Sequence, residues 1–250
     1  YLYNIVLWST RFNTGFKSLF IKLRAIPPSF FFLLPAFIFI GGWWGKKFSP
    51  TAPVTVSIAT TGFSEIIFQL VVILGFQALY GYAYYRIGWI MASFMAGLCL
   101  GTIRARGIMA RTPERIPRVY KMAQLGIALY PAMLPAVFMA FRDGQAAQRF
   151  PGLFALVFAT LPIVAGFIGG LQYPLAISLM HHASGLQKAE PAKSAGFLYA
   201  MDVWGASLGA LATGIFLIPL FGIFWVALFC AAINAAVFLL LYPAKLSSTV

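Results

Sequence analysis

The chain has 250 residues, of which 61% are hydrophobic, 17% aromatic and only 9% charged. Because a soluble domain carries roughly a quarter charged residues, this composition excludes a water-facing globule and predicts an integral membrane protein. The formal net charge of +13 favours cytoplasmic loops beside anionic lipid head groups over nucleic-acid binding, since no stripe of basic and aromatic residues stands apart from the apolar segments.

Residues 1–26 mix aromatic and apolar residues with four basic ones. The stretch from Phe16 to Leu23 is typical of an amphipathic helix that lies at the membrane interface. The chain begins at Tyr1 without a secretory signal pattern, so we expect 1–26 to be a connecting segment after an upstream domain. Residues 27–250 are expected to form one transmembrane helical domain.

Seven apolar runs follow, each close to or above the roughly 20 residues that a membrane helix requires. They cover about 27–44, 54–83, 87–103, 122–141, 152–180, 195–220 and 223–242. Pro35 is expected to kink the first run, and the long fifth run is expected to be tilted or broken near Gln172–Pro174. A turn at Phe221 and Gly222 separates the last two. The predicted fold class is an all-α, polytopic transmembrane helical bundle of about seven spans.

The most polar segment is 104–121, which we expect to be a solvated loop because Pro113 and Pro117 interrupt a helix there. Its basic residues are Arg104, Arg106, Arg111, Arg115, Arg118 and Lys121. The positive-inside rule places this loop and the C-terminus in the cytoplasm. We expect the membrane to be a bacterial cytoplasmic (inner) membrane. Seven full spans would put the basic segment 1–26 outside, so either that segment is an exception or the first run does not cross completely.

Small residues four positions apart allow helix backbones to approach closely in lipid. Such pairs are Gly97 and Gly101, Gly166 and Gly170, and Gly205 and Gly209. They predict tight packing of the third, fifth and sixth spans, within the chain rather than between copies.

Two acidic residues, Glu65 and Asp202, lie inside apolar runs, and Gln69 shares a helical face with Glu65. A charge at membrane depth costs on the order of 3 kcal/mol, so each acid is a functional candidate. One interpretation is a pathway for protons or a polar substrate. The interpretation that the sequence favours places Glu65 near the cytoplasmic end of its helix and Asp202 in the first two turns of its own. Interfacial water, arginine or the helix dipole would then satisfy both.

Catalytic and cofactor motifs are missing from the sequence: it contains no Walker A loop, CxxC, HExxH or GxSxG. His181 and His182 are adjacent and point in different directions on a helix, so they do not predict a metal or haem site. Cys99 and Cys230 lie in apolar runs and are interpreted as packing residues. We therefore expect no enzyme activity, cofactor or metal in this chain.

Four segments share their order and spacing with a known family. They are 61–72, 92–101, 170–176 and 196–202, the last followed in step by Gly205, Gly209–Leu211, Pro219–Leu220 and Gly222. Together they resemble the C-terminal membrane half of fused, membrane-embedded spermidine-synthase-like proteins. Tyr1 to Phe12 looks like the tail that follows the synthase-like domain in longer members. The resemblance implies a transporter-like membrane half, with a Rossmann-type enzyme half upstream that this chain does not contain.

The leading functional hypothesis is a non-catalytic integral membrane domain that acts as a complex subunit or as an anchor for an attached soluble domain. The alternative is a transporter for a polar or cationic small molecule such as a polyamine, with Glu65, Gln69 and Asp202 along its pathway. A redox subunit is a third class, but no ligand pair supports it. The expected partners are membrane lipids, including anionic head groups, and other membrane subunits, not nucleic acid.

Overall fold

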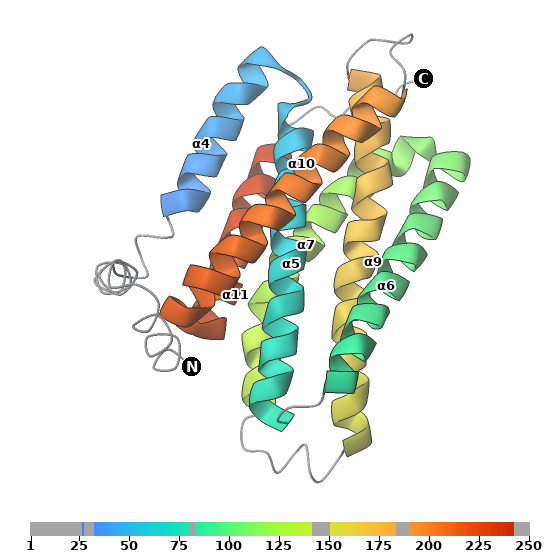
Figure 1. Ribbon diagram of the computed structural model, residues 1–250. Coiled ribbons are helices and arrows are strands. Elements are labelled where there is room, and N and C mark those ends of the chain that lie inside the picture. The colour runs from blue at the N-terminus through green and yellow to red at the C-terminus, as the bar shows by residue number, and fades with distance from the viewer. Residues whose placement is uncertain (1–26, 28–32, 81–83, 142–150, 184–190, 243–250) are drawn as a thin grey trace.

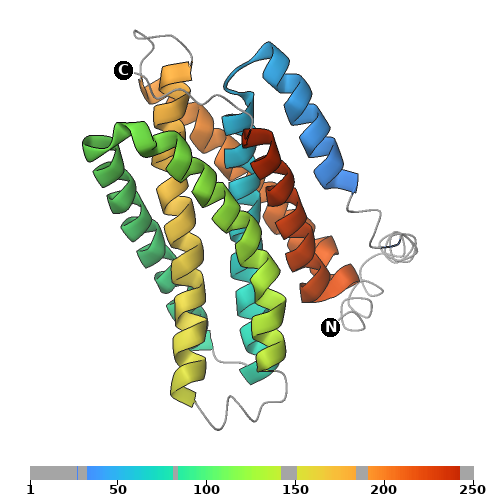
Figure 2. The ribbon, with the colours of Figure 1, turned by 180° about the vertical axis from the view of Figure 1, so that it is seen from behind.

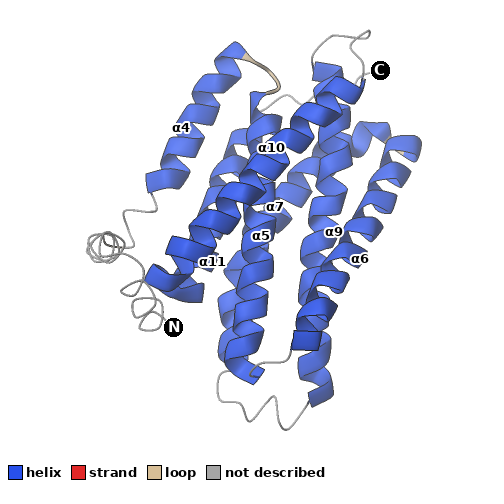
Figure 3. Ribbon diagram, in the orientation of Figure 1, coloured by secondary structure: helices blue, strands red, loops and turns tan. Residues whose placement is uncertain are grey.

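The computed structural model describes residue 27 and residues 33–80, 84–141, 151–183 and 191–242, and all secondary structure within these ranges is helical (Figure 3). The elements are α4 (Leu33–Phe48), α5 (Ala52–Tyr80), α6 (Tyr84–Arg111), the 3-10 turn η1 (Pro113–Arg115), α7 (Ile116–Ala140), α9 (Pro151–Ala183), α10 (Pro191–Leu211), the π-helical turn η2 (Ala212–Leu217) and α11 (Ile218–Leu241). The predicted all-α bundle is therefore confirmed. The interfacial helix expected at 16–23 lies outside the described residues.

Five segments of the described chain are long and apolar enough to cross a membrane. They are Ala52–Leu79, Ile87–Arg111, Pro113–Ala140, Gly152–His181 and Ala192–Leu241. The last has 50 residues and is interrupted at Gly222, whose φ of 75° and ψ of 171° are not helical. Glycine tolerates this φ because it has no Cβ to clash with the backbone. The expected turn at Phe221 and Gly222 is present, whereas the segments found number five rather than seven.

The prediction of a loop over 104–121 is wrong. Helix α6 continues to Arg111, and α7 begins at Ile116 with Pro117 in its first turn. A proline in the first turn of a helix removes an N–H that has no helical partner in any case, so it favours a helix start rather than a loop. The non-helical connection is thus confined to Thr112 and the single η1 turn that follows it.

The fifth span is one continuous helix, α9, of 33 residues with Pro162 and Pro174 inside it. The break near Gln172–Pro174, one of the two alternatives for this long span, is therefore absent. The irregularity lies instead in the sixth span, where α10 passes into the π-helical turn η2 before α11 begins. The sequence contained no signal that predicted this turn.

Helix α5 lies in the middle of the bundle, where it contacts α4, α7, α9, α10 and α11 (Figures 1 and 2). Helix α6 lies on the outside and packs along α9. The C-terminal ends of α4, α6, α9 and α11 meet the N-terminal ends of α5, α7 and α10 at one end of the bundle, at the top of Figure 1. We call this end the basic end, because it contains the basic residues of 104–121.

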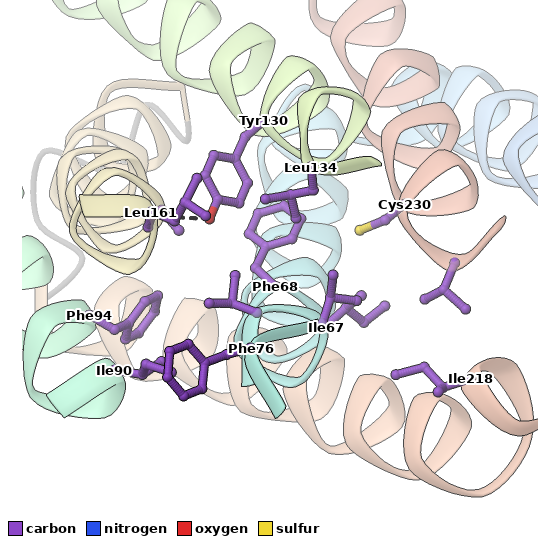
Figure 4. Close-up of a cluster of buried hydrophobic side chains, with 14 of the residues drawn as sticks. Ile67, Phe68, Phe76, Ile90, Phe94, Tyr130, Leu134, Leu161, Ile218 and Cys230 are labelled. Atoms are coloured by element: carbon purple, nitrogen blue, oxygen red, sulfur yellow. Dashed lines mark hydrogen bonds between the residues drawn. The ribbon is translucent and has the colours of Figure 1, made fainter. Parts of the chain in front are cut away.

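Two clusters of buried apolar side chains form the core, one toward each end of the bundle. The first includes Ile67, Leu134, Leu161 and Cys230 (Figure 4), and the second includes Ile58, Tyr120, Leu175 and Val237. Because α5, α7, α9 and α11 each contribute to both clusters, the residues between the clusters form a layer across the middle of the bundle. That layer is polar.

Candidate functional site

Seven side chains, which we call the polar layer, connect α5, α7, α9 and α11 between the two apolar clusters. They are Ser57, Thr61, Ser64, Tyr120, Gln124, Gln172 and Asn234, and all of them are buried. A buried polar group is costly unless it finds a hydrogen-bond partner, so the arrangement of their donors and acceptors decides what this layer does.

Gln172 of α9 links three helices at one point. Its Nε2 donates to Ser57 Oγ at 2.9 Å and to Gln124 Oε1 at 2.7 Å, while its Oε1 accepts a hydrogen bond from Thr61 Oγ1 at 2.9 Å. Ser57 Oγ in turn donates to Gln124 Oε1 at 2.8 Å and accepts from Tyr120 Oη at 2.9 Å. The side-chain amide of Gln172 is therefore fully hydrogen-bonded.

The second half of the polar layer reaches α11. Gln124 Nε2 donates to Asn234 Oδ1 at 3.1 Å, and Asn234 Nδ2 donates to Ser64 Oγ at 2.6 Å and to the carbonyl oxygen of Cys230 at 2.9 Å. Each amide has both donor and acceptor partners. A fully satisfied network of neutral groups rigidifies a helical core, so the polar layer is a structural clamp between four helices.

The two membrane acids lie elsewhere, near the middle of their helices. Glu65 is about 20 Å along α5 from its start at Ala52, and Asp202 is about 16 Å along α10 from Pro191, at 1.5 Å per residue. The expectation that both acids lie near helix ends is therefore wrong. For Asp202 the reason is that α10 begins at Pro191, which suits the first position of a helix, and not at residue 195.

The carboxyls occupy space that two glycines leave open between α5, α9 and α10. A Cβ atom on Gly169 of α9 would overlap Glu65 Oε1, and one on Gly62 of α5 would overlap Asp202. The two carboxyls lie close enough to interact electrostatically. No described residue donates a hydrogen bond to either carboxyl or forms an ion pair with it. The structure thus brings Glu65 and Asp202 together as a carboxyl pair without a neutralising partner.

Helix α10 approaches α5 closely along a face of small residues. Added Cβ atoms on Gly205 and Gly209 would clash with backbone atoms of Ala59 and Phe63. The close approach of the two helices brings Asp202 to α5. Four residues beyond Gly209, at Thr213 in η2, a fully buried hydroxyl has no hydrogen-bond partner within the described part of the chain.

The remaining glycine pairs form a second seam, between α6 and α9. Gly97 and Gly101 lie against the backbone of Ile163 and Phe167, and Gly166 and Gly170 lie against that of Phe94 and Leu98. Cys99 on the same helix is exposed. The seam holds the outer helix α6 on the bundle.

The other predicted residues are dispersed. Gln69 is partly buried, and it has no hydrogen-bond partner among the described residues. At the basic end, Arg104, Arg106, Arg111, Arg115 and Arg118 are exposed, while Lys121 Nζ donates to the carbonyl oxygen of Tyr242 at 2.9 Å. Within the described ranges, no group of three or more His, Cys, Asp and Glu side chains is arranged to hold a metal ion.

Comparison of the chain with protein-family models, with curated proteins and with solved structures found no match.

Proposed function

We propose that this chain is the membrane domain of a transporter that moves a proton or a small cation, and that the Glu65–Asp202 pair is its binding site. The observation that carries the proposal is the position of the two carboxyls in the middle of α5 and α10, near enough to repel each other and without a neutralising partner among the described residues. Acidic residues at membrane depth are costly, and in membrane proteins they mark ion and proton pathways.

The size of the ligand follows from the packing around the pair. Glu65 lies directly against Gly169, and Asp202 lies directly against Gly62, so the helices leave room for the carboxyls and little else. A proton, or a small cation that has lost most of its water, fits this space better than a bulky organic ion. A cation between the carboxyls would also remove their mutual repulsion, which favours occupancy.

The proposal includes seven membrane crossings in a bacterial cytoplasmic membrane. If straight, the segment Ala192–Leu241 would be about 75 Å long, more than twice the roughly 30 Å hydrocarbon core of a bilayer. The break at Gly222 therefore separates two crossings, α10 and α11. With α4 as the first crossing, the total is seven, and the positive-inside rule orients the basic end toward the cytoplasm.

A second candidate function is a non-catalytic subunit or anchor domain. It is favoured by the outer surfaces of α6 and α10, which expose Trp89, Met95, Trp204 and Leu208. In lipid, such a surface suits either acyl chains or the helices of another membrane subunit. Recovery of the chain as a monodisperse monomer, with no second protein in mild detergent, would remove the subunit version.

The transporter proposal is tested by ion flux in proteoliposomes that contain the wild-type chain, Glu65→Gln or Asp202→Asn. We expect both substitutions to reduce flux to the level of protein-free vesicles. Glu114→Gln is the matched control, because Glu114 is an exposed acid in the η1 turn, away from the pair. Unchanged flux in Glu65→Gln would remove the proposal.

A further inference from the structure

An apolar groove opens between α4 and α10, with α5 and α11 as its floor. Its volume is about 490 Å³, and its walls include Leu34 and Ile38 of α4, Phe63 of α5, and Trp204 and Leu208 of α10. That volume lies within the roughly 300–1,000 Å³ of ordinary ligand pockets. The groove lies between α4 and α10. Helix α4 is held on the bundle by its contacts with α5 and α11.

The groove suits an apolar occupant. Apart from the Trp204 indole, the one polar side chain in its lining is Thr60. The hydroxyl of Thr60 donates to the backbone carbonyls of Val56 and Ser57, each at 3.0 Å. Its single proton is therefore already shared between two carbonyl oxygens of its own helix, and the hydroxyl could only accept a hydrogen bond from a ligand. Among apolar molecules, a lipid acyl chain is the one that surrounds these membrane-spanning helices.

One cationic side chain, Lys46, lies on the groove-lining face of α4, toward the basic end. Ile38, Gly42 and Lys46 are four residues apart on α4, so they share one face, and Gly42 packs on Leu240 of α11. The Lys46 ammonium lies 5.8 Å from the centre of the Trp43 ring and forms no ion pair with a described acid.

We propose that one anionic phospholipid binds at this place, with an acyl chain in the groove between α4 and α10 and its phosphate beside Lys46. The phosphate neutralises the Lys46 ammonium, and basic side chains at the ends of membrane helices attract such head groups. From Lys46 to Leu34 the distance along α4 is about 18 Å, close to the roughly 15 Å depth of one leaflet's hydrocarbon. The proposal does not depend on the transporter function.

The test is native mass spectrometry of the whole chain in mild detergent after exposure to phosphatidylglycerol or to phosphatidylcholine. We expect the wild-type chain to retain one phosphatidylglycerol molecule and to retain phosphatidylcholine much less. Lys46→Gln should remove this preference, whereas Lys47→Gln, the exposed neighbour, should keep it. Equal retention of the two lipids by the wild-type chain would overturn the proposal, and so would an equal effect of the two lysine substitutions.

A groove-filling variant tests the acyl-chain half of the site. Leu34 is 44% exposed at the edge of the groove, so Leu34→Trp is expected to fold and to occupy the groove. Retention of phosphatidylglycerol should then fall while the thermal unfolding temperature stays unchanged. Undiminished retention would contradict the proposal. A dimeric wild-type chain that becomes monomeric in Leu34→Trp would also overturn it, because the occupant would then be a second copy.

Discussion

Polar residues on two faces of the same helix, α5, lie in opposite hydrogen-bonding environments. One face presents Ser57, Thr61 and Ser64 to α7, α9 and α11, where hydroxyls and amides satisfy one another. The other presents Gly62 and Glu65 to α9 and α10, where the Glu65 and Asp202 carboxyls interact electrostatically and have no hydrogen-bond or ion-pair partner in the described part of the chain. Both faces lie at the same depth of the bundle, so depth does not explain the difference.

On the proposed function, the contrast separates polar residues that stabilise the bundle from polar residues that bind a ligand. A neutral, fully hydrogen-bonded layer stabilises the bundle and has no remaining capacity to bind a ligand. An acid pair without a counter-charge is costly to bury, and it retains its capacity for a cation. Substitutions on the first face should therefore change stability, and substitutions of the acids should change function.

The largest effect on stability is expected for Gln124→Leu. This change removes the side chain that joins Ser57, Gln172 and Asn234, and it leaves buried groups unsatisfied. The free energy of unfolding should fall by on the order of 3 kcal/mol. The loss comes from several interhelical hydrogen bonds of about 0.6 kcal/mol each and from buried polar groups that are left without a partner. Reversible unfolding in mixed micelles measures it. Gln69→Leu is the matched control and should change stability much less; equal losses would contradict a clamp role for the polar layer.

A smaller but more informative effect is expected for Gly169→Ala, because the added methyl group takes the place of the Glu65 carboxyl. Overpacking of this kind costs about 1–3 kcal/mol, and the displaced carboxyl should also lose its ligand. The same unfolding assay, combined with ion flux, measures both consequences. Gly196→Ala on α10 adds a methyl group in open space and should leave stability and flux unchanged. A Gly169→Ala protein with wild-type flux would show that the position of Glu65 does not matter.

The smallest effect is expected for Thr61→Val, which keeps the shape of the side chain. It removes the hydrogen bond to Gln172 and also the bond of the same hydroxyl to the Ser57 carbonyl oxygen in its own helix. The loss should be about 0.6 kcal/mol, the average for a hydrogen bond between membrane helices. Thr55→Val provides the comparison, because the Thr55 hydroxyl bonds within its own helix, to the Thr51 carbonyl oxygen. If Thr55→Val destabilises the chain as much as Thr61→Val does, the interhelical hydrogen bond to Gln172 makes no measurable contribution of its own to stability.

Much of the fold could be predicted because the signals were local. Apolar runs, the Phe221–Gly222 turn and the pairs such as Gly97 and Gly101 are properties of single segments. The errors came where two local signals competed. Pro113 and Pro117 predicted a loop, but prolines also start helices, and the apolar residues around Ile116 and Tyr120 pack into the core.

The polar layer was missed because it depends on distant partners. Ser57, Thr61 and Ser64 are spaced along one helical face, and that spacing inside an apolar run was a usable signal for a buried polar stripe. Nothing in the sequence indicated that the stripe would meet Gln172 and Asn234, which come from helices more than a hundred residues away. Likewise, the pairing of Glu65 with Asp202 depends on the close packing of α10 on α5.

The most direct test of the carboxyl pair is infrared difference spectroscopy of the chain in lipid, recorded as Na⁺ is added and as the pH is lowered. If Glu65 and Asp202 bind a small cation or a proton, the wild-type chain and Glu114→Gln will share carboxyl bands that change with the ligand. Glu65→Gln and Asp202→Asn will lack part of them. Identical difference spectra in the wild-type chain and Glu65→Gln would contradict the assignment of this pair as the binding site.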